Sequence, residues 1–267
     1  MSGPGGPAPD RVRELAASAW VFRWQVELEA EVRFAGLANR LESLGAPTLI
    51  VELARRAAGE EARHAVLCAR QAAELGRPVP PLPPPPPPAV APSGLAEEDA
   101  VTYELTAACC VTESVSVAVL TALLPAAGDP PLRKALRELA EDEVGHARLG
   151  WAHLALARER GRTAFLGPLL PAMLEGSADD DLFLPVEPAR EDPALLPLGV
   201  LPHALKRELF VRSLEEVVFP GLEGAGVDAA AGRAWLAARA GSGAPVLPGT
   251  PAAGQPGSLP ASAAPAR

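Results

Sequence analysis

The sequence predicts an all-α protein, and three observations support this prediction. Apolar residues recur at spacings of three and four over four long segments, and strand-like segments are almost absent. Apolar residues make up 48% of the 267 residues but aromatic residues only 4%, so a core built mainly from Ala, Leu and Val is expected. A chain of this length is expected to form one domain of ordinary size or somewhat more.

The first predicted hairpin consists of two helices joined by a tight turn. The first helix is expected over residues 11–44, where Trp20, Trp24 and Phe34 recur on one face. The second begins with Pro47 in its first turn and continues to residue 75, where a glycine follows.

The second predicted hairpin is built in the same way. Its first helix is expected over residues 95–124. Its second helix starts at Asp129 and Pro130, an N-cap followed by proline at the first helical position, and ends at Gly161. Short turns within each hairpin predict that its two helices are antiparallel neighbours.

Residues 76–94 join the two hairpins and contain six consecutive prolines, Pro83–Pro88. Polyproline II rises about 3.1 Å per residue, so some fifteen residues reach roughly 45 Å. A helix of twenty-odd residues is roughly 30 Å long. The segment can therefore return along the whole bundle, as a four-helix bundle with one long crossover requires. The alternatives are a ligand for a proline-binding module and a plain linker between two domains.

The remaining segments are expected to lie outside the bundle. Residues 1–10 and 241–267 are rich in Gly, Pro, Ala and Ser and are predicted to be disordered tails. Residues 162–200 hold too many prolines for one long helix and are predicted to be irregular. Residues 201–240 are predicted to form two C-terminal helices, over 203–218 and 227–240, that flank the bundle.

Charge and cysteine content limit the partners and the location. The formal charge of −9 disfavours nucleic acid and anionic membranes as partners. We expect no apolar window to be long enough to span a membrane. The first ten residues lack the apolar region of a signal peptide. Three cysteines without a CxxC pair do not form a disulfide framework, so a cytoplasmic location is expected.

The second helix of each hairpin carries the motif Glu-x-x-His. The pairs are Glu61 with His64 and Glu143 with His146. A spacing of three places carboxylate and imidazole on the same helical face, so that both can reach one metal ion.

The first helix of each hairpin supplies one further carboxylate: Glu113 in one, and either Glu27 or Glu31 in the other. One Glu from each of two helices plus Glu-x-x-His from the other two is the ligand set of dinuclear iron or manganese bundles. Four carboxylates balance the charge of two divalent ions, and mixed carboxylate and imidazole ligands suit iron or manganese. We therefore expect two iron ions as cofactor, with manganese as the alternative.

An acidic residue precedes each motif glutamate: Glu60 in one helix and Asp142 in the other. One residue earlier on a helix turns the side chain by about 100°, toward a neighbouring helix. There it can accept the free ring N–H of a ligand histidine and orient the ring. The predicted pairs are Asp142 with His64 and Glu60 with His146.

These motifs give the chain a resemblance to the ferritin-like superfamily, and within it to bacterial ferritin-like domain proteins with dinuclear carboxylate sites. The resemblance covers about residues 20–220, without the proline run and the tails. It is carried by residues 27–34 (ELEAEVRF), 44–47 (LGAP), 60–68 (EEARHAVLC), 110–114 (CVTES), 141–151 (EDEVGHARLGW) and 199–220 (GVLPHALKRELFVRSLEEVVFP). It implies a ferritin-like four-helix bundle.

The first helix leaves two residues open as ligands. The resemblance, anchored by Phe34 and the turn at residues 44–47, implies Glu27. Distance from that turn favours Glu31, because it lies about as far before the turn as Glu61 lies after it. The two glutamates are one helical turn apart, about 5.4 Å, so they are not equivalent. Where family members follow the first ligand with a His-Ala-Ser run, this chain has Leu-Glu-Ala-Glu.

The resemblance and the ligand set together imply an oxygen-dependent oxidase or oxygenase. Its partners would be dioxygen and a small-molecule substrate or electron donor. Oxidation, storage or other handling of iron is the first alternative, and a metal-free helical interaction bundle is the second. The proline crossover, the segment 162–200 and both tails would hinder assembly into a cage, so a monomer or dimer is expected.

Overall fold

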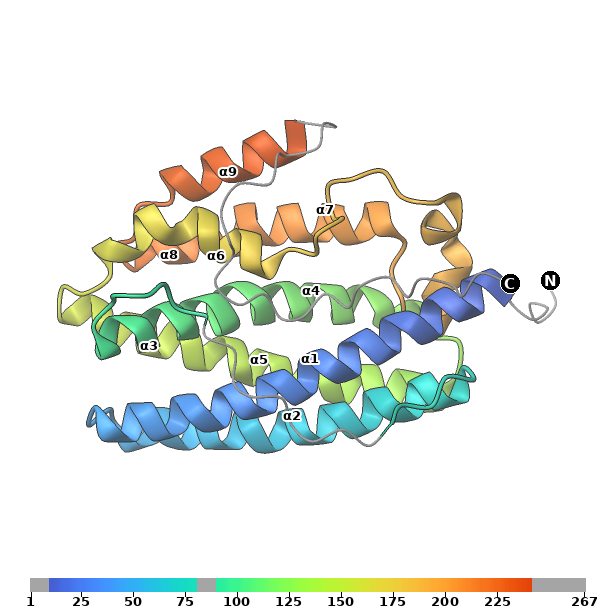
Figure 1. Ribbon diagram of the computed structural model, residues 1–267, viewed down its shortest axis with the longest axis horizontal. Coiled ribbons are helices and arrows are strands. Elements are labelled where there is room, and N and C mark those ends of the chain that lie inside the picture. The colour runs from blue at the N-terminus through green and yellow to red at the C-terminus, as the bar shows by residue number, and fades with distance from the viewer. Residues whose placement is uncertain (1–9, 81–89, 242–267) are drawn as a thin grey trace, which may run out of the picture.

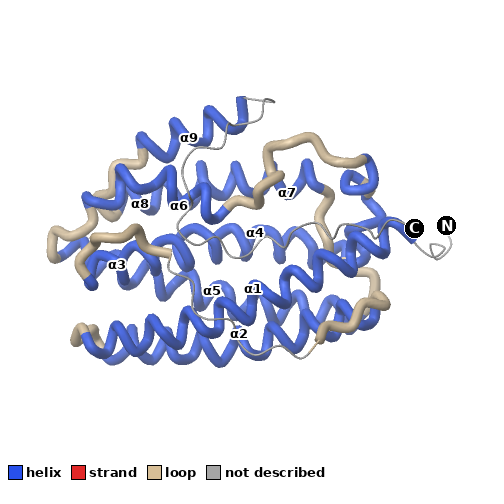
Figure 2. Tube along the Cα trace, viewed as in Figure 1, coloured by secondary structure: helices blue, strands red, loops and turns tan. Residues whose placement is uncertain are grey.

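The computed structural model describes residues 10–80 and 90–241, and in this part of the chain it contains helices and turns but no strand (Figures 1 and 2). The prediction of an all-α fold is therefore confirmed. Pro83–Pro88 and nearly all of the two predicted tails lie outside the described residues. Asp10 begins the first helix and Gly241 ends the last, so both residues belong to the helical part rather than to a tail.

Four long helical segments make up the part of the molecule that carries the candidate site. In chain order they are α1 (Asp10–Ser43), α2 (Thr48–Glu74), a continuous run over Glu97–Ala126, and α5 (Pro130–Glu159). Helix α1 packs along α2, α2 against α5, and α5 against the third segment, whose first part also contacts α1 (Figure 1). Each segment thus has two of the others as neighbours.

The turns within the hairpins are formed by the residues that the sequence predicts. Gly45 adopts a left-handed conformation with φ +68°, which favours glycine. Its N–H donates to the carbonyl of Glu42, and the N–H of Ala46 donates to the carbonyl of Leu41, which closes the C-terminus of α1. At the start of α5, Asp129 Oδ1 accepts a hydrogen bond from the N–H of Leu132 at 2.7 Å.

The third segment is not the regular α-helix predicted over residues 95–124. It consists of α3 (Glu97–Leu105), the π-helix η1 (Thr106–Glu113), α4 (Ser114–Leu123) and the 3₁₀ turn η2 (Leu124–Ala126). A π-helix adds residues to each turn and changes which side chains face the core, and such segments are frequent at functional sites. Apolar spacing alone does not reveal it, because most residues of η1 are buried.

This segment also corrects the expectation that no window is long enough to span a membrane. Glu97–Ala126 has the length and apolar composition of a membrane-crossing helix, with a mean hydropathy of 1.9 in its most apolar window. Half of that window is buried against the rest of the protein. The buried residues of this window belong to the core of the fold.

Helices α6 (Leu170–Ser177) and α7 (His203–Ser213) of the chain beyond α5 pack against η1 and α4, on the side away from α2, whereas residues 188–198 pack against α1 (Figure 1). Residues 162–200 are less irregular than predicted, because they include helix α6 among three 3₁₀ segments. These segments are η3 (Ala164–Leu169), η4 (Pro188–Glu191) and η5 (Pro193–Leu198).

The C-terminal helices differ from their predicted bounds. The helix predicted to end at residue 218 continues to residue 224 as α7 (His203–Ser213), the π-helix η6 (Leu214–Val218) and α8 (Phe219–Gly224). Pro220 lies directly after the π-helix η6, within this continuous helical run. The last helix, α9 (Ala230–Gly241), begins three residues later than predicted.

Candidate metal centre

The six residues expected to bind metal come from four helical segments and are all buried. Their positions are Glu27 on α1, Glu61 and His64 on α2, Glu113 at the end of η1, and Glu143 and His146 on α5. Their side chains converge between the helices, and we refer to them as the carboxylate–histidine cluster.

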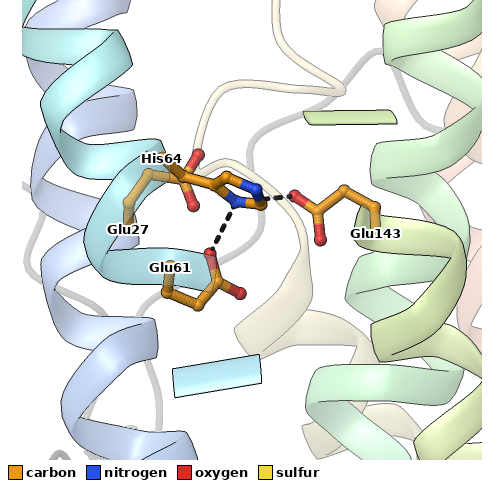
Figure 3. A group of neighbouring side chains, drawn as sticks. All are labelled: Glu27, Glu61, His64 and Glu143. Carbon is orange, nitrogen blue, oxygen red and sulfur yellow. Dashed lines mark hydrogen bonds and ion pairs between the residues drawn. The ribbon is translucent and has the colours of Figure 1, made fainter. Parts of the chain in front are cut away.

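The cluster divides into two overlapping groups, in each of which the donor atoms lie within 4.8 Å of one another. One group contains Glu27, Glu61, His64 and Glu143 (Figure 3). The other contains Glu61, Glu113, Glu143 and His146. Glu61 and Glu143 belong to both groups, one from α2 and the other from α5. The arrangement therefore has the form of two adjacent sites with two shared carboxylates.

Both histidines turn Nδ1 toward the shared carboxylates. Nδ1 of His64 lies 3.0 Å from Oε2 of Glu61, and Nδ1 of His146 lies 2.9 Å from Oε2 of Glu143. Nδ1 of His146 also lies 3.1 Å from Oε1 of Glu61. The spacing of three places each carboxylate and imidazole together, as expected for neighbouring turns of a helix.

The opposite ring nitrogen of each histidine meets an acidic residue of the other helix. Nε2 of His64 lies 3.2 Å from Oδ2 of Asp142, and Nε2 of His146 lies 3.0 Å from Oε2 of Glu60. These are the two pairs that the sequence predicts. A proton held on Nε2 by a carboxylate leaves Nδ1 free as a donor atom toward the cluster.

On α1 the structure brings Glu27, and not Glu31, into the cluster. Glu27 is buried with a relative exposure of 7% and belongs to the first group of donors. Glu31, one turn further along, is only partly buried and belongs to neither group. Helix α1 thus presents the residue that the resemblance implies, rather than the one favoured by distance from the turn.

Burial and the neighbouring charges shift the pKa values of the cluster. Burial raises the pKa of Glu27 well above its usual range, and the negative charges of Glu61 and Glu143 add to this shift. The pKa of Glu113 is raised well above its usual range by the same causes: burial first, then Glu143 and Glu61. Burial also raises the pKa of Glu61, but hydrogen bonds from His146 and His64 outweigh it and lower the pKa to about 2. Without a cation in the cluster, Glu27 and Glu113 therefore resist becoming negative beside this charge.

The histidines respond in the opposite direction. Burial lowers the pKa of His146, but hydrogen bonds to Glu143 and Glu61 outweigh it and raise the pKa to about 12. Burial also lowers the pKa of His64, but the hydrogen bond to Glu61, the charges of Glu61 and Glu143 and the hydrogen bond to Asp142 together outweigh it and raise the pKa. The cluster thus attracts positive charge, whether from protons or from metal ions.

Two further side chains approach the cluster without being predicted to do so. The hydroxyl of Ser116 on α4 donates to Oε1 of Glu143 at 3.5 Å. Sγ of Cys68, one turn beyond His64, lies 3.9 Å from Oε1 of Glu27, and burial raises the pKa of this thiol well above its usual range. Cys68 could have been found from its spacing of four after His64, whereas the position of Ser116 depends on the π-helix before it.

The donor set suits two divalent ions that prefer oxygen and nitrogen ligands. Four carboxylates and two imidazoles without a thiolate ligand are typical of iron or manganese rather than of a structural zinc site. Two divalent ions would balance the four carboxylate charges that burial otherwise opposes. The residues present therefore fit a dinuclear metal centre.

Comparisons with known proteins identified no relative. No protein-family model, curated protein or solved structure matched the chain.

Proposed function

We propose that this protein is a dinuclear metal protein with a ferritin-like four-helix bundle. The observation that carries the proposal is the pair of overlapping donor groups that share Glu61 and Glu143. In this proposal Glu27 and His64 bind one ion and Glu113 and His146 bind the other, while the two shared carboxylates contact both. Support for the bundle comes from the packing of α1, α2, the Glu97–Ala126 segment and α5 around the cluster.

We propose iron as the metal, with manganese as the alternative, and oxygen-dependent oxidation of a small molecule as the reaction. A bound pair of iron ions would supply the electrons that reduce dioxygen. The protein's own part is to hold the ligands in a place closed to water. Ser116 holds one oxygen of Glu143 through its hydroxyl, and Cys68 lies beside Glu27 as a buried, uncharged thiol.

Oxidation or handling of iron is the second candidate, because the same donor set would serve a reaction whose only reactants are iron and dioxygen. One hollow, of about 400 Å³, lies between the start of α1 and the end of α2 and is lined by Arg13, Leu75 and Arg77 among others. Another lies beside Trp235 and Glu175. Neither of these two hollows is lined by a residue of the cluster.

Anaerobic loading with Fe²⁺ followed by exposure to oxygen tests the proposal. Mössbauer spectra should show two coupled ferric ions per chain after oxidation, and oxygen consumption should follow the amount of iron loaded. His64→Ala should lower both. Binding of well under one iron per chain, with no change in stability, would instead favour a metal-free interaction bundle. A particle of about twenty subunits in size-exclusion chromatography would favour iron storage in a cage.

A further inference from the structure

Two arginines on the exposed face of α2 end the hydrogen-bonded chains that begin at the histidines. Nε of Arg56 donates to Oε1 of Glu60 at 2.6 Å, and the other oxygen of this carboxylate faces Nε2 of His146. A terminal nitrogen of Arg63 donates to Oδ2 of Asp142 at 3.1 Å. The same oxygen of Asp142 lies beside Nε2 of His64.

The two carboxylates are largely buried, whereas the arginines bonded to them are exposed to solvent. The side chain of Glu60 is 6% exposed and that of Arg56 is 71% exposed. For Asp142 and Arg63 the exposures are 14% and 53%. A carboxylate removed from water costs free energy unless a positive or donor group compensates it. Arg63 compensates Asp142, and Arg56 compensates Glu60 through the hydrogen bond at 2.6 Å, with Arg63 as a second, more distant partner of Glu60 at 3.8 Å.

We propose that Arg56 and Arg63 are positioning residues for the metal centre. Each holds the carboxylate that orients one imidazole, without contacting any of the six cluster residues itself. Loss of an arginine frees its carboxylate to turn toward solvent, and the ring that it orients then loses its fixed direction. This inference rests on the proposed function. The direction of each imidazole affects metal binding only if Nδ1 is a ligand of the metal ion.

Helix α2 contains a matched control for Arg56. Nε of Arg70 donates to Oε1 of Glu74 at 3.0 Å, which is again an arginine bonded to a glutamate four residues later. The exposure of Arg70, 67%, is close to that of Arg56, but its glutamate is 43% exposed and contacts no histidine of the cluster. Arg56→Gln and Arg70→Gln therefore change the same kind of ion pair, and only the first is connected to the cluster.

The first experiment is an anaerobic titration of the purified full chain with Co²⁺, followed by its visible absorption. Arg56→Gln and Arg63→Gln should each weaken Co²⁺ binding by about tenfold, the lower end of the usual effect of such supporting residues, and should shift the cobalt bands. Arg70→Gln should bind like the wild type. Lysine at position 56 or 63 should restore part of the affinity, because its ammonium can still donate to the carboxylate.

The second experiment requires no metal. In proton NMR spectra, the Nε2–H signals of His64 and His146 should exchange slowly with water in the wild type. Arg63→Gln should remove the slow signal of His64 and retain most of that of His146, because Glu60 keeps its hydrogen bond from Arg56. Arg56→Gln should remove the slow signal of His146 and retain that of His64. Far-UV circular dichroism and thermal unfolding verify that each variant is folded.

The outcomes separate this inference from the proposed function. If the wild-type protein binds no Co²⁺, the proposed function is wrong, and so is the role of Arg56 and Arg63 in metal binding. This holds even if the NMR signals behave as expected. Normal Co²⁺ binding by the wild type, with equal affinities in all three glutamine variants and unchanged Nε2–H signals, overturns the positioning role alone. An equal loss of affinity in all three variants would show a general effect of charge and would also overturn it.

Discussion

A β-carbon on Gly150 of α5 would lie only 2.4 Å from Cβ of Cys109 on the π-helix η1. The two helices therefore approach each other at a distance that only glycine permits. Gly150 lies one turn after His146, and η1 ends at Glu113, so this contact positions two of the candidate ligands relative to each other. The close packing of these two backbones therefore affects the positions of the ligands in the cluster.

Gly150→Ala should destabilise the protein by about 2 kcal/mol, because the added methyl group forces the two helices apart. It should also weaken metal binding, since Glu113 moves with η1. Chemical denaturation and Co²⁺ titration measure the two effects. Gly145→Ala is the control on the same helix: a Cβ there meets nothing within 4 Å, so it should be neutral or stabilising by up to about 1 kcal/mol. Similar losses in both variants would contradict the steric explanation.

Glu143→Ala should impair binding of both metal ions, because Glu143 belongs to both donor groups. Glu113→Ala should impair binding of one ion only, because Glu113 belongs to one group. Metal analysis after anaerobic loading and desalting measures the difference. Glu141→Ala, which removes an exposed carboxylate two residues before Glu143, should retain the wild-type metal content. Equal metal content in the first two variants would argue against shared carboxylates.

Substitution on α1 distinguishes the two glutamates that the sequence leaves open. Glu27→Ala should remove one of the two ions, whereas Glu31→Ala should leave the metal content unchanged because Glu31 lies outside both donor groups. Metal content and Co²⁺ spectra are the measurements. The reverse result would assign the ligand role to Glu31 and would require a shift of α1 by one turn.

Metal binding should stabilise the folded protein, because two divalent ions offset the repulsion among buried carboxylates. At a free metal concentration of one hundred times Kd, the expected gain is about 2.7 kcal/mol for each site. Thermal unfolding with and without Mn²⁺ measures it, and a chelator should reverse the shift. A mutant with both His64→Ala and His146→Ala should show little of this gain. An equal gain in wild type and mutant would indicate binding elsewhere.

His153 should contribute a pH dependence of stability that is separate from the cluster. Burial, together with the charge of Arg160, lowers its pKa from 6.5 to about 4. Since the pKa is lower in the folded state, its contribution is fully present above pH 6.5 and is lost between pH 6.5 and 4. In this window wild type should lose about 1–2 kcal/mol more than His153→Gln, as measured by denaturant unfolding. Parallel profiles would show that His153 is not buried in its neutral form.

Apolar periodicity together with cap, proline and glycine signals predicts most of the helical ends to within one or two residues. Periodicity also predicts the face of α1 that carries Trp20, Trp24 and Phe34, which are all buried. It fails at η1 and η6, because a π-helix depends on how a helix packs against its neighbours and not on local spacing. It also misses α6, where Pro171 and the nearby Pro168 obscure a short helix.

The pairing of carboxylate and imidazole within Glu61–His64 and within Glu143–His146 follows from the sequence, because two residues three apart on an α-helix share a face wherever the helix lies. Among the contacts between helices, the sequence predicts the pairs of His64 with Asp142 and of His146 with Glu60, but others do not follow from it. The position of Glu27 beside Cys68, the close approach at Gly150 and the hydrogen bond from Arg63 to Asp142 depend on the crossing and register of segments far apart in the chain. These are set by the packing of whole helix surfaces, which no local pattern records.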